Sequence, residues 1–357
     1  MGNPDICIAG AGIIGLSLAL ELHQRGFRVT VLEKAGPLAE ASTAAAGMLA
    51  DEDPHIPPAL RPFADLSLTL YPGYLDRLSS FSGIKVPFQT HTTIQKDTAK
   101  PWRLRNPLCR TDLDRLLPGN TLGEGHFYLL DEKSLDPRQL ATALLAAVHA
   151  TSIKIQSNTP VSTTRSRDRT IEVQTPAGVL HASHFIDCTG TWATTTSALS
   201  NVKVVPRKGQ MLSVSLPSSL ALNLVVRTPD IYIVPRTSGP DTGRAIIGAT
   251  VEDAGFDKTV HPSDIAHLHS LATHLLPALA DAPQLEAWAG LRPATPDGLP
   301  LLGALTDRPN HFMASGHFRD GILLAPATAH VMAEILSGES PSVDLTPFSP
   351  ARNIPIR

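Results

Sequence analysis

The sequence has few of the residues that mark several common classes of protein. Only three of its 357 residues are cysteines, and Cys7, Cys109 and Cys188 show no C-x-x-C spacing. They therefore predict neither a disulfide framework nor a zinc site. The formal net charge is −3, which gives no electrostatic reason to expect a nucleic acid or an anionic membrane as partner. Aromatic residues make up only 5% of the chain, which gives no hint of an aromatic cage for a bulky amine.

Long hydrophobic runs and targeting signals are also missing. The apolar stretch around residues 6–20 is interrupted by three glycines and is too short to span a bilayer. The chain enters the segment DICIAGAGIIG almost at once, without a basic region or a cleavage site. We therefore expect a soluble, cytoplasmic protein. The 14 histidines are scattered, and none makes a pair at helical spacing with a third ligand, so we predict no metal site.

The N-terminal segment DICIAGAGIIGLSLALELHQRGFRVTVLEK predicts a strand, a glycine turn, a helix and a second strand. Gly10, Gly12 and Gly15 form the pattern G-x-G-x-x-G. In this pattern the first glycine makes the tight turn, the second lets a pyrophosphate approach, and the third lets the helix pack on the strand. Glu33 closes the second strand about 20 residues further on, where an acid can accept hydrogen bonds from an adenosine ribose. The motif predicts a dinucleotide site, but it does not separate NAD from FAD, and Glu33 argues only against a 2′-phosphate.

The segment EASTAAAGMLA, residues 40–50, contains small and almost uncharged side chains. Such a stretch suits a backbone that runs close under a flat ring better than it suits a surface loop. Together with the glycine turn and Glu33, STAAAGMLA resembles the glycine oxidase and D-amino-acid oxidase family of FAD enzymes. Within that family, AAAGML is most similar to the glycine oxidases of thiamine biosynthesis.

Further segments resemble the same family in the order that the family has them. PDIYIVPRTSG (229–239) and IIGATVEDAGFDK (246–258) resemble the sheet that roofs the substrate pocket. WAGLRPATPDGLPLLG (288–303) and GHFRDGILLAPATA (316–329) resemble the return of the chain to the flavin and the last flavin contact. The resemblance covers most of the chain and is weakest from about residue 51 to 130.

The resemblance implies an α/β fold in which a discontinuous, Rossmann-like FAD-binding domain carries an antiparallel-sheet substrate domain, as in D-amino-acid oxidase. Independently, the sequence predicts a helix capped by Asp136 and β-type alternation over residues 203–251. A second helix is expected over residues 262–280. We place the FAD-binding domain at 1–80, 134–198 and 287–357, and the substrate-binding domain at 81–133 and 199–286.

Three residues are candidates for the catalytic site. Taken alone, Arg292 in AGLRPATPDG could be a surface arginine on a turn, and Tyr232 in IYIVPR could be an ordinary core tyrosine. The resemblance instead implies that Arg292 binds the substrate carboxylate through two parallel hydrogen bonds and that Tyr232 reaches the same group. It places Arg319 beside the active site, in a loop that contacts the flavin. Relatives often have Asn where this chain has Asp320, whose carboxylate could pair with Arg319.

The resemblance also implies the residues that contact FAD. We expect the cofactor to be bound noncovalently, since some sarcosine oxidases attach it through a cysteine in the C-terminal part and no cysteine follows Cys188 here. The expected contacts are Gly10, Gly12, Ile13, Ile14, Gly15, Glu33, Lys34, Ala41, Ser42, Ala46, Gly47, Met48, Val161, Gly190, His317, Phe318, Arg319, Asp320, Gly321, Ile322 and Leu323.

The activity that this resemblance implies is the oxidation of glycine or a similar small amino acid by hydride transfer to flavin, with molecular oxygen as the second substrate. Alternatives on the same fold are a sarcosine, D-amino-acid or cyclic-amine oxidase, or a dehydrogenase that passes electrons to a quinone or another protein. A nucleotide-binding module without catalysis would need neither Arg292 nor Tyr232. A homo-oligomer is compatible with the sequence, which fixes neither the oligomeric state nor the fate of the imine.

Overall fold

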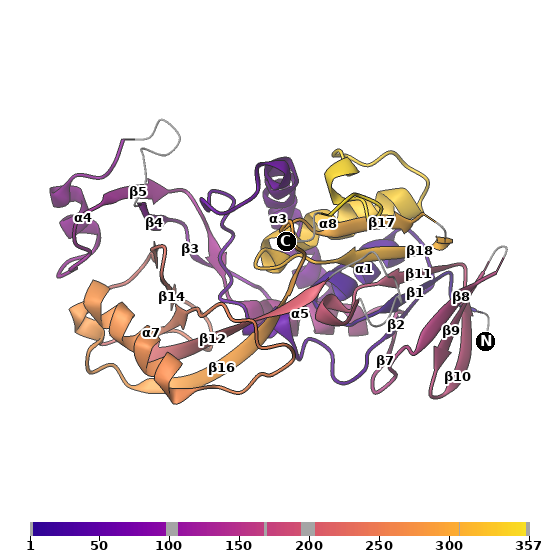
Figure 1. The fold of residues 1–357 in the computed structure, drawn as a ribbon, viewed down its shortest axis with the longest axis horizontal. Coiled ribbons are helices and arrows are strands. Elements are labelled where there is room, and N and C mark those ends of the chain that lie inside the picture. Colours follow the sequence, from indigo (N-terminus) through magenta and orange to yellow (C-terminus); the bar gives the residue numbers. More distant parts are fainter. Residues whose placement is uncertain (1–2, 98–105, 168–169, 194–203, 307, 355–357) are drawn as a thin grey trace.

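Two large sheets lie along the longest axis of the molecule in the computed structural model (Figure 1). The structure describes residues 3–97, 106–167, 170–193, 204–306 and 308–354. The six-stranded sheet lies on the side of Figure 1 where β1 and β2 are labelled, and the seven-stranded sheet lies on the side of β12 and β16. The N-terminal and C-terminal parts of the chain both contribute to the six-stranded sheet.

The six-stranded sheet is parallel except at one edge. Its strands, in spatial order, are β17 (Leu301–Leu305), β18 (Arg308–Ser315), β11 (His184–Asp187), β1 (Ile6–Ala9), β2 (Val29–Leu32) and β7 (Lys154–Gln156). Only β17 and β18 pair in antiparallel fashion. Every residue of β1 and β2 is buried, because layers cover both faces of the sheet, as is usual for parallel strands.

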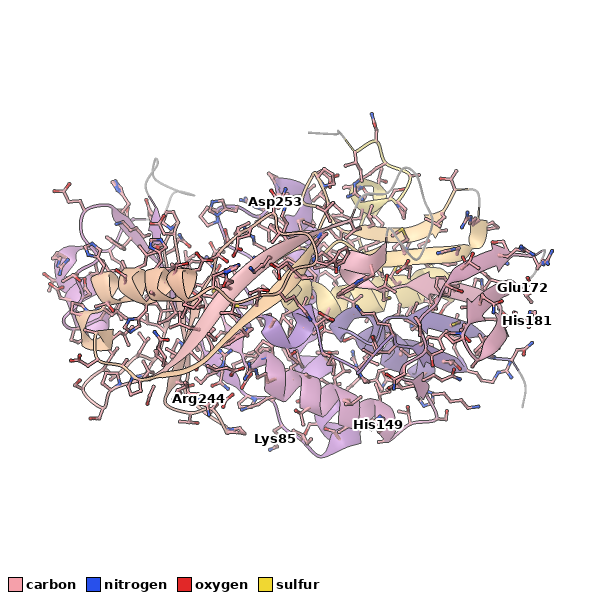
Figure 2. All side chains as sticks on the ribbon, turned by 60° about the horizontal axis from the view of Figure 1, so that its bottom comes forward. Lys85, His149, Glu172, His181, Arg244 and Asp253 are labelled. Carbon is pink, nitrogen blue, oxygen red and sulfur yellow. The ribbon has the colours of Figure 1, made fainter. Side chains whose placement is uncertain are left out.

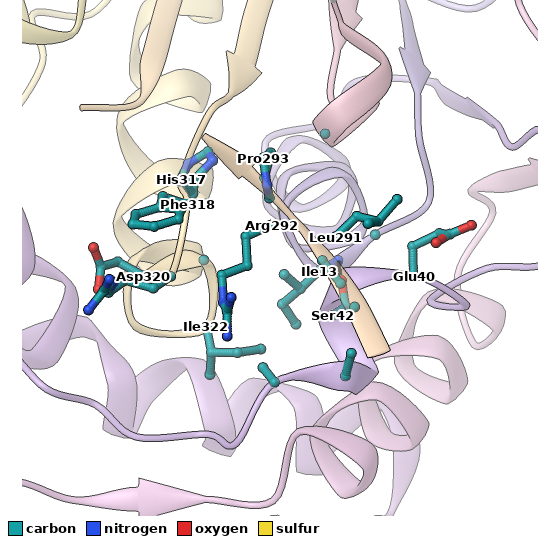
Figure 3. Close-up of a pocket in the computed structure, with 18 of the residues that line it drawn as sticks. Ile13, Glu40, Ser42, Leu291, Arg292, Pro293, His317, Phe318, Asp320 and Ile322 are labelled. Carbon is teal, nitrogen blue, oxygen red and sulfur yellow. Dashed lines mark hydrogen bonds between the residues drawn. The ribbon is translucent and has the colours of Figure 1, made fainter. Parts of the chain in front are cut away.

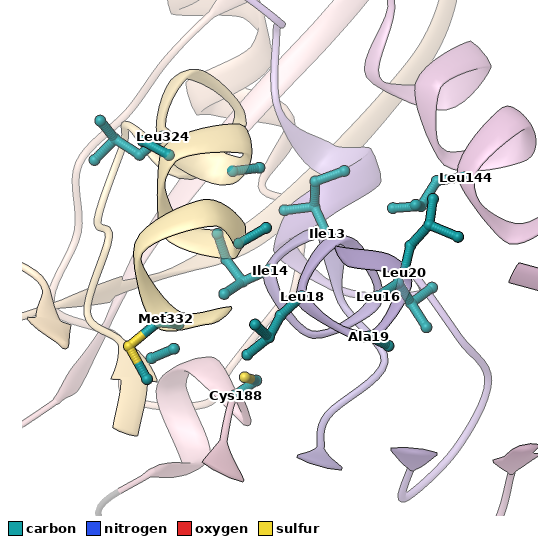
Figure 4. Packing of buried hydrophobic residues seen from close by; sticks show 14 of the residues in the cluster. Ile13, Ile14, Leu16, Leu18, Ala19, Leu20, Leu144, Cys188, Leu324 and Met332 are labelled. Atoms are coloured by element: carbon teal, nitrogen blue, oxygen red, sulfur yellow. The ribbon is translucent and has the colours of Figure 1, made fainter. Parts of the chain in front are cut away.

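Helices cover one face of this sheet, and a small antiparallel sheet covers the other. The helices are α1 (Ile13–Gln24), α3 (Arg61–Ser82), α5 (Pro137–His149) and α8 (Gly321–Leu336). Figure 4 shows Leu18 of α1 below Ile14 and above Cys188, within the core that these helices share. The small sheet contains β8 (Thr163–Ser166), β9 (Ile171–Thr175) and β10 (Gly178–Ala182). Glu172 and His181, which pair across β9 and β10, lie at the end of the molecule in Figure 2.

The seven-stranded sheet is antiparallel except for the parallel pair of β13 and β4. Its strands, in spatial order, are β16 (Gln284–Ala294), β12 (Val205–Ser215), β15 (Arg244–Gly248), β14 (Tyr232–Arg236), β13 (Val225–Arg227), β4 (Thr93–Asp97) and β5 (His126–Leu130). One face packs on α4 (Arg110–Leu116) and α7 (Pro262–Leu275) through residues such as Leu212, Ile233 and Ile247. Because side chains alternate along a strand, Met211, Tyr232 and Gly248 face the opposite way, toward the rest of the molecule.

Short elements complete the structure. Residues of the alanine-rich segment form the helix α2 (Ala41–Ala44), and β3 (Phe88–Thr90) pairs with β6 (Ser134–Leu135). Single 3₁₀ turns occur at η1 (Pro58–Leu60), η2 (Gly190–Trp192), η3 (Pro277–Leu279) and η4 (Thr346–Phe348). Within the described ranges, no helix is long and apolar enough to cross a membrane.

Several local predictions are confirmed. The Asp136 side chain accepts a hydrogen bond from the Arg138 N–H and caps α5, as its place before a proline predicted. The expected helix over residues 262–280 is shorter and is followed by a 3₁₀ turn. The predicted domain boundary at residues 198 and 199 lies outside the described residues, and the one at 287 falls inside β16 of the seven-stranded sheet.

We expect Leu18→Ala to lower the free energy of unfolding by ~2–5 kcal/mol, because it would leave a cavity where a fully buried leucine fills the core. Leu285→Ala is the matched control, since 47% of that side chain is exposed and its loss should cost less than ~0.5 kcal/mol. Urea unfolding followed by circular dichroism measures both. Equal losses in the two variants would contradict the core described above.

Candidate active site

A cavity of about 530 Å³ lies where the two large sheets meet. Its volume is within the range of small-molecule sites, ~300–1,000 Å³. The cavity is lined by the glycine turn before α1, the alanine-rich segment, the inner face of the seven-stranded sheet and the first turn of α8. Arg292, Tyr232 and nearly all the predicted cofactor contacts are among the lining residues; Gly15 and Leu323 lie behind the wall.

The glycine turn has the geometry that its sequence predicts. Gly10 has a φ of +99°, and a Cβ at this position would lie 2.5 Å from the carbonyl oxygen of Cys188. A Cβ on Gly15 would lie 2.0 Å from the carbonyl oxygen of Gly10, so only glycine lets α1 approach β1 this closely. The N-terminus of α1 therefore points into the cavity with N–H groups that no helix carbonyl can satisfy, which suits a pyrophosphate.

The Glu33 carboxylate is fixed at the end of β2 by backbone N–H groups. Ala11 donates to its Oε2 atom at 2.8 Å, and Ala35 donates to its Oε1 atom at 3.1 Å. Each carboxylate oxygen can accept more than one hydrogen bond, so both remain able to accept from a ribose hydroxyl. Ser42 lies at the other side of the turn, where its Oγ accepts from the Ile13 N–H at 2.9 Å.

The alanine-rich segment passes between the two sheets and is bonded to the seven-stranded one. Trp288 Nε1 donates to the Ala44 carbonyl at 3.0 Å, and Arg236 Nη2 donates to the Ala46 carbonyl at 2.9 Å. A Cβ on Gly290 would lie 2.6 Å from the Cβ of Ala44, so there is no room for a larger side chain at this crossing. The small residues are thus required by close packing.

The loop before α8 is held against the end of β16. Phe318 donates its N–H to the Pro293 carbonyl at 2.8 Å and has a φ of +49°, which is uncommon outside glycine. His317 is buried and lies 3.0 Å from the Thr328 hydroxyl, and its burial lowers its pKa to about 3. The imidazole is therefore neutral at ordinary pH and fills the loop beside the first turn of α8.

The expected pairing of Arg319 with Asp320 is not found. Within the described residues, no ion pair of 4.0 Å or less joins them, because the Arg319 guanidinium lies over the Phe318 ring, 4.9 Å from its centroid. Asp320 lies at the N-terminal cap of α8 without a side-chain capping bond. Burial raises its pKa to about 7, a shift that the charge of Arg319 opposes and that of Asp53 strengthens.

Arg292 projects from β16 into the cavity, between Ile13 on one side and Ile322 on the other (Figure 3). Its Nη1 atom donates to the Thr250 carbonyl at 3.1 Å and to the Lys208 carbonyl at 3.4 Å. The guanidinium lies flat over Gly209, where a Cβ would come within 2.3 Å of both Nη atoms. Two neutral carbonyls thus orient the group while its charge stays available to an anion.

Tyr232 belongs to a row of residues that crosses five strands on the cavity side. Gln95, Arg227, Tyr232, Gly248 and Met211 are successive cross-strand partners. The Tyr232 hydroxyl lies 3.3 Å from the Met211 sulfur, and a Cβ on Gly248 would lie 2.7 Å from that hydroxyl. Burial raises the pKa of Tyr232, while the nearby Arg292 charge lowers it, so the hydroxyl stays protonated near neutral pH.

The sequence analysis missed a buried polar cluster at the edge of the cavity. Arg227 forms two contacts with the Glu132 carboxylate, at 2.9 and 3.0 Å, and its Nε donates to Gln95 Oε1. Asp53 also lines the cavity, and the Arg227 charge helps to lower its pKa. A hairpin prediction would have placed Arg227 directly opposite Tyr232, whereas Asp53 lies in the stretch that resembles the family least.

The chain is similar to known proteins over nearly its whole length. The family model described as DAO, FAD dependent oxidoreductase, matches residues 5–335. The bifunctional protein ThiO/ThiG of Trichormus variabilis is 36% identical over 93% of this chain, which spans only 52% of that relative. The chain thus spans about half the length of the bifunctional relatives that it matches.

A shorter relative and its solved structure match from end to end. The glycine oxidase of Geobacillus kaustophilus is 30% identical over 98% of this chain and 97% of its own length. The crystal structure of glycine oxidase from Geobacillus kaustophilus has a TM-score of 0.91, with 29% identity over 99% of this chain and 100% of that one. The family match and these similarities cover nearly all of the sequence, so the chain belongs to the DAO family of FAD-dependent oxidoreductases, and its cofactor is FAD.

Proposed function

We propose that this protein catalyses the FAD-dependent oxidative deamination of glycine or a similar small amino acid. Glycine, oxygen and water would yield glyoxylate, ammonia and hydrogen peroxide; the imine formed first would be hydrolysed or would feed the thiazole ring of thiamine. The observation that carries the proposal is the position of Arg292 beside Tyr232 in the same cavity as the dinucleotide turn. The similarity to proteins named glycine oxidase supports it.

In this proposal the cavity wall positions the substrate by its carboxylate. Arg292 would donate two parallel hydrogen bonds to the carboxylate, because its plane is already set by the Thr250 and Lys208 carbonyls. The Tyr232 hydroxyl would donate to the same group. Arg319 adds positive charge at the neighbouring loop, and the reaction gains mainly from this fixed orientation.

The cofactor would lie along the residues that the resemblance assigns to it, from Glu33 past the glycine turn to the first turn of α8. Bound FAD supplies the acceptor for the two electrons that leave the substrate. Helix α8 begins with Gly321, Ile322 and Leu323, whose N–H groups form the positive end of the helix. This end would stabilise negative charge that develops nearby. The neutral His317 packs behind this turn and takes no part as an acid.

We further propose a cytoplasmic location and noncovalent attachment of FAD. All three cysteines are free, which is usual in a reducing compartment. Cys7 and Cys188 are buried, and burial raises the pKa of each thiol, so neither is suited to attack a flavin as a thiolate. Cys109 precedes α4, on the outer face of the seven-stranded sheet.

We expect the purified protein to show flavin absorption bands that bleach when glycine is added without oxygen. The same sample should release its yellow colour on acid precipitation, because the attachment is noncovalent. Bands that persist with glycine but bleach with sarcosine, D-alanine or D-proline would move the substrate to one of these amines. A protein that cannot take up FAD would overturn the whole proposal.

We expect Arg292→Ala to raise the KM for glycine by about 10–100-fold, since a charge-assisted hydrogen bond pair is worth roughly 1.5–3 kcal/mol. Flavin content should change far less. Steady-state kinetics and the ratio of flavin to protein absorbance measure the two effects. An unchanged KM in the flavin-loaded variant would remove Arg292 from the substrate site.

A second variant tests the orientation of Arg292 while keeping its charge. Gly209→Ala would place a methyl group within 2.3 Å of the guanidinium and push it off its carbonyl partners. We expect a raised KM again. Gly36→Ala is the matched control, because a Cβ there meets nothing within 4 Å.

We expect ionisation of Asp320 to weaken substrate binding above about pH 7, because burial raises the pKa of this carboxyl to about 7. The charges that face it are Arg319, Asp53 and Arg227. Below pH ~7 the carboxyl is neutral and resembles the amide in Asp320→Asn; above it, the added negative charge opposes the substrate carboxylate. We therefore divide kcat/KM of the wild type by kcat/KM of Asp320→Asn at each pH. This ratio should fall roughly 2–5-fold from pH 6 to pH 8, which corresponds to ~0.4–1 kcal/mol of lost transition-state stabilisation. A ratio that stays constant with pH would show that the Asp320 charge does not reach the substrate.

A further inference from the structure

The loop between β15 and α7, residues 249–261, leaves the seven-stranded sheet and reaches the nucleotide side of the cavity. Its base is fixed to β12, because the Lys208 N–H donates to the Glu252 carbonyl at 3.0 Å and the Glu252 N–H donates back at 2.9 Å. Asp253, labelled in Figure 2, forms an ion pair with Arg207 on the same strand. The first residues of the loop are therefore held on β12.

Two contacts join the far part of this loop to the other half of the molecule. The Phe256 ring lies against Trp192, with 5.4 Å between the ring centroids, although half of the Phe256 surface remains exposed. The Lys258 ammonium lies 3.0 Å from Glu40 Oε2. Both Trp192 and Glu40 line the cavity, and Figure 3 shows Glu40 at the opposite end of it from Asp320.

Lys34 links these two contacts, because it touches both Trp192 and Glu40. Its ammonium is 3.0 Å from the centroid of the Trp192 ring and 3.7 Å from Glu40 Oε1. Lys34 follows directly on Glu33, the residue expected at the adenosine ribose. Together Lys258, Glu40, Lys34, Trp192 and Phe256 form a continuous set of contacts across this end of the cavity.

We propose that residues 249–261 form a strap that retains the adenosine part of FAD, and that the contacts of Phe256 and Lys258 set the rate at which FAD leaves. This rests on the placement of FAD along the glycine turn and Glu33. The contacts are of two kinds: a ring pair that salt does not weaken, and an exposed ion pair that salt screens. Opening the strap would require the loss of both, and residues 255–258 are otherwise exposed.

The test is the rate of FAD release, followed as the rise of free flavin fluorescence after dilution of the holoenzyme. Phe256→Ala should speed release and raise the Kd for FAD by about 2–10-fold, the range that an aromatic pair supports. Phe256→Tyr keeps the ring and should restore slow release. Val179→Ala is the control, since Val179 is equally exposed on β10 but lies in the small antiparallel sheet.

Salt separates the ion pair from the ring pair. Lys258→Met keeps most of the side-chain stem but removes the charge, so it should speed release in low salt and match the wild type in high salt. Wild-type release rates in both Phe256→Ala and Lys258→Met would overturn the strap. Because the readout is FAD binding alone, the strap can fail while glycine still bleaches the flavin, and glycine oxidation can fail while the strap holds.

Discussion

The passage of the alanine-rich segment between the two sheets is the constraint on which the rest of the site depends. The Ala44 and Ala46 carbonyls accept hydrogen bonds from Trp288 and from the buried Arg236. With Gly290 packed against Ala44, the two halves approach as closely as backbone and methyl groups allow. A larger side chain would separate the wall that carries Arg292 from the turn that begins α1, and the cavity would lose its shape.

The arginines of the cavity differ in whether an acidic side chain already neutralises their charge. Arg227 is buried against Glu132, so its charge serves mainly to hold that wall together. Arg292 instead bonds to neutral carbonyl oxygens, and its charge remains available to a carboxylate ligand. Asp320, which also lines the cavity, adds a carboxyl whose pKa burial raises to about 7. The cavity thus combines an arginine that is bonded to neutral groups with a carboxyl whose pKa lies near neutrality.

Several parts of the fold could be predicted from local sequence because they rest on local physics. Glycines at positions 10 and 15 fit only a tight strand-to-helix turn, and Asp136 before a proline starts a helix. The possible ion pair of Arg319 with Asp320 is not found among the described residues, because the Arg319 guanidinium lies over the Phe318 ring. The cluster of Arg227, Glu132 and Gln95 was missed, because its members are far apart in sequence and meet only when the strands pair.

From the sequence by itself, the spacing of the glycines determined the local turn chemistry. The family and the FAD cofactor followed from a resemblance that runs through several segments of the chain. The tertiary structure decided how the side chains that share the cavity contact one another. Strand register brings Tyr232 opposite Arg227, and close packing places the Arg292 guanidinium flat over Gly209. Packing also brings the Phe256 ring into contact with Trp192 of the other half of the molecule. Contacts such as those of Arg292 with Gly209 and of Phe256 with Trp192 join residues distant in the chain, so they arise only when the chain packs.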